Sequence, residues 1–152
     1  MPLDFIHNHK DFASLIEMIA EEMDTDPFLV EKDYWLMHCL YGLQRLGMTF
    51  ELKGGTSLSK GYGIIQRFSE DIDLRIKPPE GMAVSTGRNQ DKPAHMGSRK
   101  RYYDWLASTI RMSGIHKVER DTEYDDVKYR SGGIRLRYNE INKNNTGLKD
   151  GV

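Results

Sequence analysis

The stretch from residue 51 to residue 76, ELKGGTSLSKGYGIIQRFSEDIDLRI, constrains the fold of this chain more than any other. Its pattern predicts a short strand, a double-glycine turn, a helix over residues 56–62 and a second strand over residues 71–76. Side chains alternate between the two faces of a strand, so Asp71 and Asp73 are expected on one face. The other face is then apolar and directed toward the core, through Ile72, Leu74 and Ile76.

Two kinds of chemistry meet in this stretch. Neighbouring carboxylates repel each other unless a cation lies between them, and hard divalent cations prefer such oxygen ligands. The glycine turn offers backbone amides and hydroxyls at the start of a helix, where the helix dipole favours phosphate. The turn consists of Gly54, Gly55, Thr56 and Ser57. A phosphate-binding turn beside a metal-binding carboxylate pair is the minimum equipment for chemistry on nucleotides.

Other phosphate-handling motifs fit the chain less well. Residues 54–61 do not supply the G-x-x-x-x-G-K-[ST] pattern of a Walker-type loop. Aspartate-based phosphatases usually carry Thr or Val two positions after their second Asp, where this chain has Arg75. Sugar transferases usually reach their Asp-x-Asp motif after several βα units, whereas two expected helices and one strand precede it here. A solvated surface strand is the remaining alternative, and the glycine turn argues against it.

The pairing of GGTSL with RFSEDIDL resembles the nucleotidyltransferase family of the abortive-infection toxins AbiEii and AbiGii. These are minimal members of the polymerase-beta-like superfamily. The upstream residues 31–35, EKDYW, also match the family pattern, and the specific part of the resemblance covers residues 28–76. The resemblance implies an α+β nucleotidyltransferase fold, with a central mixed sheet flanked by helices and two helices at the N-terminus.

The resemblance also implies roles for individual residues. Gly54, Gly55, Thr56 and Ser57 would hold the triphosphate, and Asp71 and Asp73 would be the catalytic ligands of two Mg²⁺ ions, with Mn²⁺ as the alternative metal. Arg67 and Ser69 belong to the RFSxD signature, in which Arg67 either binds phosphate or supports the loop. Lys60 either reaches a phosphate or faces solvent. Lys32 is expected to form a local salt bridge with Glu31 or Asp33, and Glu70 to be structural.

The implied activity is transfer of a nucleotide from a nucleoside triphosphate to a hydroxyl acceptor, with release of pyrophosphate. Family resemblance further suggests tRNA as the acceptor, a toxin–antitoxin or abortive-infection setting, and a cognate antitoxin as partner. Two rival functions stay open. One is a nucleotide-binding pseudoenzyme or inactive fragment, and the other is a sugar transferase that uses the Asp-x-Asp motif.

Composition indicates one domain, because the chain has 152 residues, of which 38% are hydrophobic and 30% charged. The sequence contains no apolar run long enough for a membrane span and no signal-peptide apolar block. Cys39 is the only cysteine, so neither a disulfide framework nor a cysteine-based zinc site is expected, and we expect it to be buried. These features predict a cytoplasmic protein.

The net charge of −1 conceals an uneven distribution. Residues 1–35 carry nine acids and two bases, whereas the rest of the chain carries fourteen acids and twenty bases. The basic excess accompanies the predicted site and suits either an RNA partner or the phosphates of a nucleotide. The densest basic patch, Arg99, Lys100 and Arg101, is the best candidate for polynucleotide contact, with a solvated helix start as the alternative.

The remaining pattern is read as helices followed by strands. We expect a first helix capped by Asn8, and a second capped by Asp26 with Pro27 at its first position and Gly47 after its end. A strand over residues 49–53 follows, and a long loop spans residues 77–98. A third helix is expected to be capped by Ser98 and to end before Gly114. Strands are then expected over residues 115–121, 127–130 and 134–141.

A third metal-binding carboxylate is hard to find in this chain. The resemblance implies one on a later strand, yet the late acids fit poorly: Glu119, Asp121, Glu123 and Glu140. Residues 142–147 form a turn signal shortly before the last residue. We therefore expect the N-terminal part of a longer protein, inactive or nearly so in this form, with an open sheet edge that invites self-association.

Overall fold

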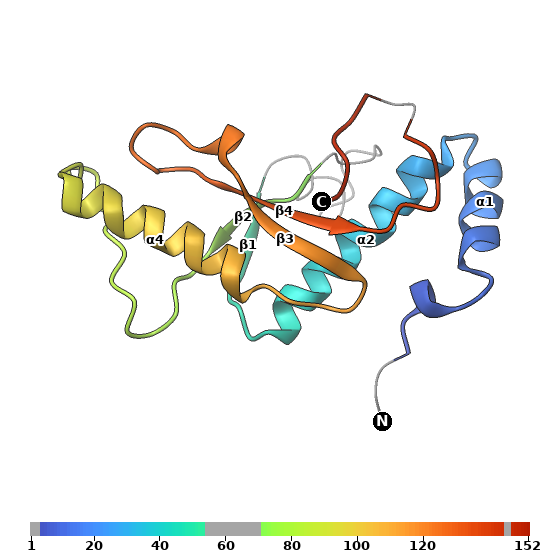
Figure 1. Cartoon of the computed structure of the whole chain (residues 1–152), viewed down its shortest axis with the longest axis horizontal. Coiled ribbons are helices and arrows are strands. Elements are labelled where there is room, and N and C mark those ends of the chain that lie inside the picture. Colours follow the sequence, from blue (N-terminus) through green and yellow to red (C-terminus); the bar gives the residue numbers. More distant parts are fainter. Residues whose placement is uncertain (1–3, 54–70, 145–146) are drawn as a thin grey trace.

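The computed structural model describes residues 4–53, 71–144 and 147–152. Helices α1 and α4 lie at opposite ends of the molecule, and α2 runs from beside α1 to the middle, where the strands lie (Figure 1). The helices are α1 (Phe12–Glu22), α2 (Pro27–Arg45) and α4 (Pro93–Thr109), and the strands are β1 (Phe50–Lys53), β2 (Asp73–Ile76), β3 (Ile115–Asp121) and β4 (Gly133–Tyr138). Two 3₁₀ turns, η1 (Ile6–Asn8) and η3 (Thr122–Tyr124), precede α1 and follow β3. The predicted α+β class is confirmed.

Helix α2 begins and ends where its sequence signals predict. The Asp26 carboxylate accepts a hydrogen bond of 2.8 Å from the Phe28 amide, and Pro27 is the first helical residue. Gly47 follows the last turn with a φ of 80°, which a residue with a side chain rarely adopts. The prediction for α1 is wrong at its start, because Asn8 belongs to the η1 turn and Asp11 is the residue before the helix.

The described strands pair as two antiparallel two-stranded sheets, β1–β2 and β3–β4, instead of the single central mixed sheet that we expected. In the first sheet Phe50 lies opposite Ile76 and Lys53 opposite Asp73. Side chains from α4 and η3 connect β2 and the residues before it to the second half of the chain. The Tyr102 hydroxyl on α4 donates to the Ile76 carbonyl, and the Tyr124 hydroxyl donates to Asp71. The other edge of β4 is paired at Leu136, whose amide and carbonyl both bond to Val152.

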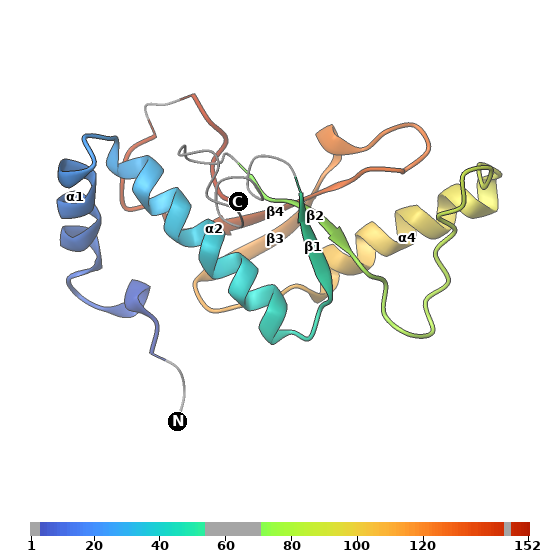
Figure 2. The same ribbon diagram turned by 180° about the vertical axis from the view of Figure 1, so that it is seen from behind.

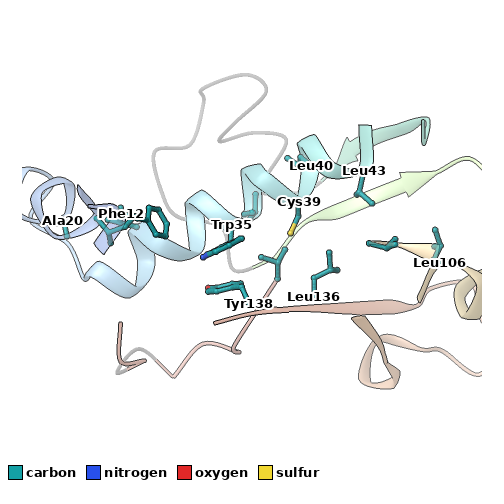
Figure 3. Packing of buried hydrophobic residues seen from close by; sticks show 14 of the residues in the cluster. Phe12, Ala20, Trp35, Cys39, Leu40, Leu43, Leu106, Leu136 and Tyr138 are labelled. Atoms are coloured by element: carbon teal, nitrogen blue, oxygen red, sulfur yellow. The ribbon is translucent and has the colours of Figure 1, made fainter. Parts of the chain in front are cut away.

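Helix α2 supplies more buried core residues than any other element that the structure describes. Seen from behind, it runs beside β1, with α1 beyond its first turns (Figure 2). Its buried face meets β4 and α4, as the side chains of Figure 3 show, and the Trp35 and Tyr138 rings stack with centroids 4.9 Å apart. Cys39 is buried in this layer, as predicted, and burial raises the pKa of its thiol to about 12.

Two local predictions in the second half are wrong. Helix α4 begins at Pro93, so Ser98 lies inside it, where its hydroxyl donates to the His95 carbonyl. Residues 127–130 form a turn instead of a strand, because the Asp126 carboxylate accepts from the amides of Lys128 and Arg130 at 3.2 and 2.6 Å. Tyr129 has a φ of 53° in this turn, which is incompatible with a strand.

Candidate functional site

A cleft of about 1120 Å³ is bordered by β1, β2, α4 and β4. Acidic side chains line it at Glu51, Asp71 and Asp73. Basic side chains line it from several elements: Lys53, Arg75, Lys77, Arg99, Arg130 and Arg135. Most of the lining is uncharged, and among its charged side chains the basic ones outnumber the acidic ones, a balance that favours a bound phosphate ester.

Strand β2 shows the predicted alternation, but it begins at Asp73 instead of residue 71. Ile72, Leu74 and Ile76 pack against the core, while Asp73 and Arg75 are exposed on the alternate positions. Asp71 precedes the strand and is half-buried. Asp73 lies opposite Lys53 in the β1–β2 register, so residues of opposite charge share a cross-strand position.

Asp71 also has a partner that sequence reasoning missed. The Tyr124 hydroxyl donates a hydrogen bond of 3.2 Å to Asp71 Oδ2. Tyr124 belongs to the η3 turn after β3, and it lies far from Asp71 in the sequence. No local pattern joins the two residues, because their contact depends on how the two sheets pack.

Three of the four late acids, Asp121, Glu119 and Glu123, are paired with basic neighbours, whereas Glu140 is not paired with any in the part of the chain that the structure describes. Asp121 lies 2.7 Å from the Arg135 guanidinium; burial alone would raise the pKa of Asp121, but the hydrogen bond and charge of Arg135 lower it. Hydrogen bonds from Lys117 and then from Arg137 lower the pKa of Glu119. Glu123 is paired with Lys149. Burial, followed by the neighbouring Asp150, raises the pKa of Glu140.

The carboxylates on β2 and just before it suit magnesium by their chemistry. Magnesium is commonly bound by one or two carboxylates together with substrate phosphates, and Asp71 and Asp73 offer that set of oxygen donors. Within residues 4–53, 71–144 and 147–152, no group of three His, Cys, Asp or Glu side chains could hold a metal ion. The described residues thus offer two carboxylates that could hold a cation together with phosphate oxygens of a substrate.

The acidic and basic residues at the start of α2 have a different role from the one expected. Lys32 and Glu31 are 1% and 0% exposed. The Lys32 ammonium donates to the carbonyls of Lys149 and Gly151 at 2.6 and 3.0 Å, and Glu31 accepts from the Ile141 amide at 3.1 Å. The predicted local salt bridge is wrong, since neighbouring residues of a helix do not face each other. Both side chains fasten the C-terminal segment to α2.

The basic patch on α4 is only partly available to a ligand. Arg99 is 3% exposed and donates to the carbonyls of Ser85, Gln90 and Lys128. The Lys100 ammonium lies 3.0 Å from the Asp104 carboxylate, whereas Arg101 is exposed. The prediction that Arg99 contacts a polynucleotide is therefore wrong, because its guanidinium holds the loop before α4 and the turn before β4.

The glycine turn and the RFSxD lead-in lie outside the residues that the structure describes. The predictions on this part of the chain concern the helix over residues 56–62 and Gly54, Gly55, Thr56, Ser57, Lys60, Arg67, Ser69 and Glu70. The helix and the roles of these residues therefore stay predictions. The described residues that flank this part of the chain, Lys53 and Asp71, both line the cleft.

Comparison with known protein families gives a match. The family model described as "Nucleotidyl transferase AbiEii toxin, Type IV TA system" matches residues 36–149. No curated protein and no solved structure matches the chain. In the part of the chain that the structure describes, every helix is too short or too polar to cross a membrane.

Proposed function

Because the chain belongs to the AbiEii family of nucleotidyl transferase toxins of type IV toxin–antitoxin systems, we propose that it transfers a nucleotide from a nucleoside triphosphate to an RNA hydroxyl. We propose tRNA as the acceptor and pyrophosphate as the second product. The reaction takes place in the cytoplasm, and a cognate antitoxin counteracts the toxic effect. The observation that carries this proposal is the placement of Asp71 and Asp73 at a cleft whose charged lining residues are mostly basic.

The carboxylates of Asp71 and Asp73 would hold the divalent ions in this reaction. Bound Mg²⁺ supplies charge neutralisation at the phosphates and lowers the pKa of a hydroxyl that it contacts. The chain itself orients Asp73, since the apolar alternate residues of β2 pack against the core and leave Asp73 directed outward. Lys53, opposite Asp73, limits the repulsion between the acids and the incoming phosphates.

The triphosphate would be bound by the glycine turn that follows β1. In this proposal Gly54 and Gly55 let the backbone approach the phosphates, and Thr56 and Ser57 donate hydrogen bonds. Arg67, Ser69 and Lys60 would add further phosphate contacts. Replacing Gly55 with Val would weaken triphosphate binding, because a β-branched side chain would obstruct both the turn and the approach of a phosphate. An unchanged affinity of that variant for the triphosphate would show that the turn does not bind it.

The test is an incubation of the protein with each labelled nucleoside triphosphate, total tRNA and Mg²⁺ or Mn²⁺, followed by denaturing electrophoresis. Label on RNA, with release of pyrophosphate, supports the proposal. Label on the protein indicates self-modification, and binding without transfer indicates a nucleotide-binding pseudoenzyme. A parallel incubation with labelled nucleotide sugars tests the sugar transferase alternative. The Asp73→Asn variant is the negative control for every incubation.

A further inference from the structure

The contact between Tyr124 and Asp71 joins the two sheets at the edge of the cleft. Both residues line the cleft, and the Tyr124 hydroxyl lies 3.2 Å from Asp71 Oδ2. A hydroxyl donor at this distance restricts the rotation of a carboxylate and engages one of its oxygens. The contact therefore acts on a group that the proposed function uses as a metal ligand.

The polypeptide around Tyr124 holds this hydroxyl in place. The η3 turn is capped by Asp121, whose carboxylate accepts from the Glu123 amide at 3.3 Å. The Ser131 hydroxyl donates to the Tyr124 carbonyl at 2.7 Å. Gly133 lies so close that an added Cβ would be 2.6 Å from Tyr124 Cδ2. The turn is thus built against β4, with a glycine where a side chain would displace the ring.

One face of the Tyr124 ring is already covered by a lysine. The Lys149 ammonium lies over it, 4.5 Å from its centroid. Glu123 and Asp121 hold that ammonium in place, the latter at 3.6 Å. A lysine over the ring face occupies a position that a stacked nucleobase would need. The hydroxyl, and not the ring face, is therefore the part of Tyr124 that serves the cleft.

We propose that Tyr124 is a positioning residue that orients the Asp71 carboxylate for a divalent cation. The inference rests on the proposed function, because it takes Asp71 as a metal ligand. Partners that orient a metal-binding side chain typically contribute 10- to 100-fold to metal affinity or activity. Removing only the Tyr124 hydroxyl should therefore weaken cation binding while leaving the two acidic ligands in the chain.

The chain offers a matched pair of variants for the test. Tyr124→Phe removes the donor to Asp71, whereas Tyr103→Phe removes a donor to the Arg130 carbonyl at the same distance of 3.2 Å. The dissociation constant of Mn²⁺ is measured by electron paramagnetic resonance for each variant of the full chain. The Mg²⁺ concentration at half-maximal transfer is measured in parallel. Circular dichroism and thermal unfolding confirm that each variant is folded.

We expect Tyr124→Phe to raise the Mn²⁺ dissociation constant about tenfold or more, with transfer restored by excess Mg²⁺, and Tyr103→Phe to leave the constant unchanged. In an Asp71→Asn background the second change, Tyr124→Phe, should have no further effect, because the hydroxyl acts through Asp71. A Tyr124→Phe variant that loses stability but binds Mn²⁺ like the wild type overturns the inference. If Asp71→Asn alone leaves Mn²⁺ binding unchanged, the metal assignment in the proposed function fails, and the inference fails with it.

Discussion

The start of α2 and the strand β2 both carry charged residues in a short motif, and the fold uses them in opposite ways. Glu31 and Lys32 are almost fully buried and bind main-chain groups of the C-terminal segment. Asp73 is exposed at the cleft, and Asp71 is half-buried beside it. The first motif serves the folded structure, and the second serves the proposed chemistry.

The difference follows from the cost of burying charge. A buried ammonium or carboxylate must find hydrogen-bond partners within the protein, since the lost hydration is otherwise uncompensated. Glu31 and Lys32 find theirs in backbone amides and carbonyls more than 100 residues away along the chain. A strand with one apolar face keeps its acidic residues at the surface, where a dissolved cation can reach them.

The largest expected effect is loss of transfer activity when the carboxylate pair is changed. Asp73→Asn should lower the rate by at least about 100-fold, because it removes electrostatic stabilisation of the reacting phosphates. Its free energy of unfolding should stay within about 0.5 kcal/mol of the wild type, as for other surface changes. Labelled-nucleotide transfer and urea unfolding measure both quantities, with Glu17→Gln on the exposed side of α1 as control. Near-normal turnover of the variant would show that Asp73 takes no part in the transfer reaction.

The second expected effect is loss of stability when the buried motif is changed. Lys32→Met keeps the apolar stem but leaves the carbonyls of Lys149 and Gly151 without their ammonium donor. We expect a loss on the order of 1–3 kcal/mol in the free energy of unfolding. Urea unfolding measures it, and Lys10→Met at an exposed position is the control. A variant that keeps its stability but loses transfer would overturn the contrast between the two motifs.

A smaller effect is expected at the helix caps. Asp26→Ala should destabilise the protein by about 1 kcal/mol, because it removes the acceptor for the Phe28 amide at the start of α2. Asp11 precedes α1 without a capping bond from its side chain, so Asp11→Ala should have a much smaller effect. Thermal unfolding of the two variants compares them directly. Equal losses would show that the Asp26 bond contributes nothing specific to α2.

The smallest effect should be a fall in stability on acidification. Burial lowers the pKa of both His7 and His38; the neighbouring His38 lowers the pKa of His7 further, while Asp4 raises it. The unfolded chain therefore takes up protons first, and stability falls as pH drops below about 6.5. Thermal unfolding between pH 8 and pH 5 measures the slope.

The His38→Gln variant tests the source of this slope, because His38 Nε2 donates to the Ser113 carbonyl at 2.7 Å. Removing the titrating ring should make the dependence on pH shallower, since one fewer group gains protons on unfolding. A slope as steep as that of the wild type would assign the effect to other groups.

Local sequence patterns predicted the structure correctly where residues of a single segment determine it. The cap and the end of α2, the bounds of β3 and the alternation of β2 follow from residues close together in the sequence. The turn at residues 127–130 shows the limit of such reasoning. Its residues have strand propensity, but Asp126 captures two amides and closes a turn. The splitting of the expected sheet into two likewise depends on packing between distant elements.

The sequence by itself determined the carboxylate pair, the place of Asp73 on an amphipathic strand and the family of the chain, because each is encoded by neighbouring residues. The tertiary structure alone decided which charged residues are buried and which reach the cleft. Arg99 and Lys32 look like surface cations in the sequence, yet both are buried and donate hydrogen bonds to backbone carbonyls of distant segments. Tyr124 meets Asp71 for the same reason, since contacts between distant segments arise only when the chain packs.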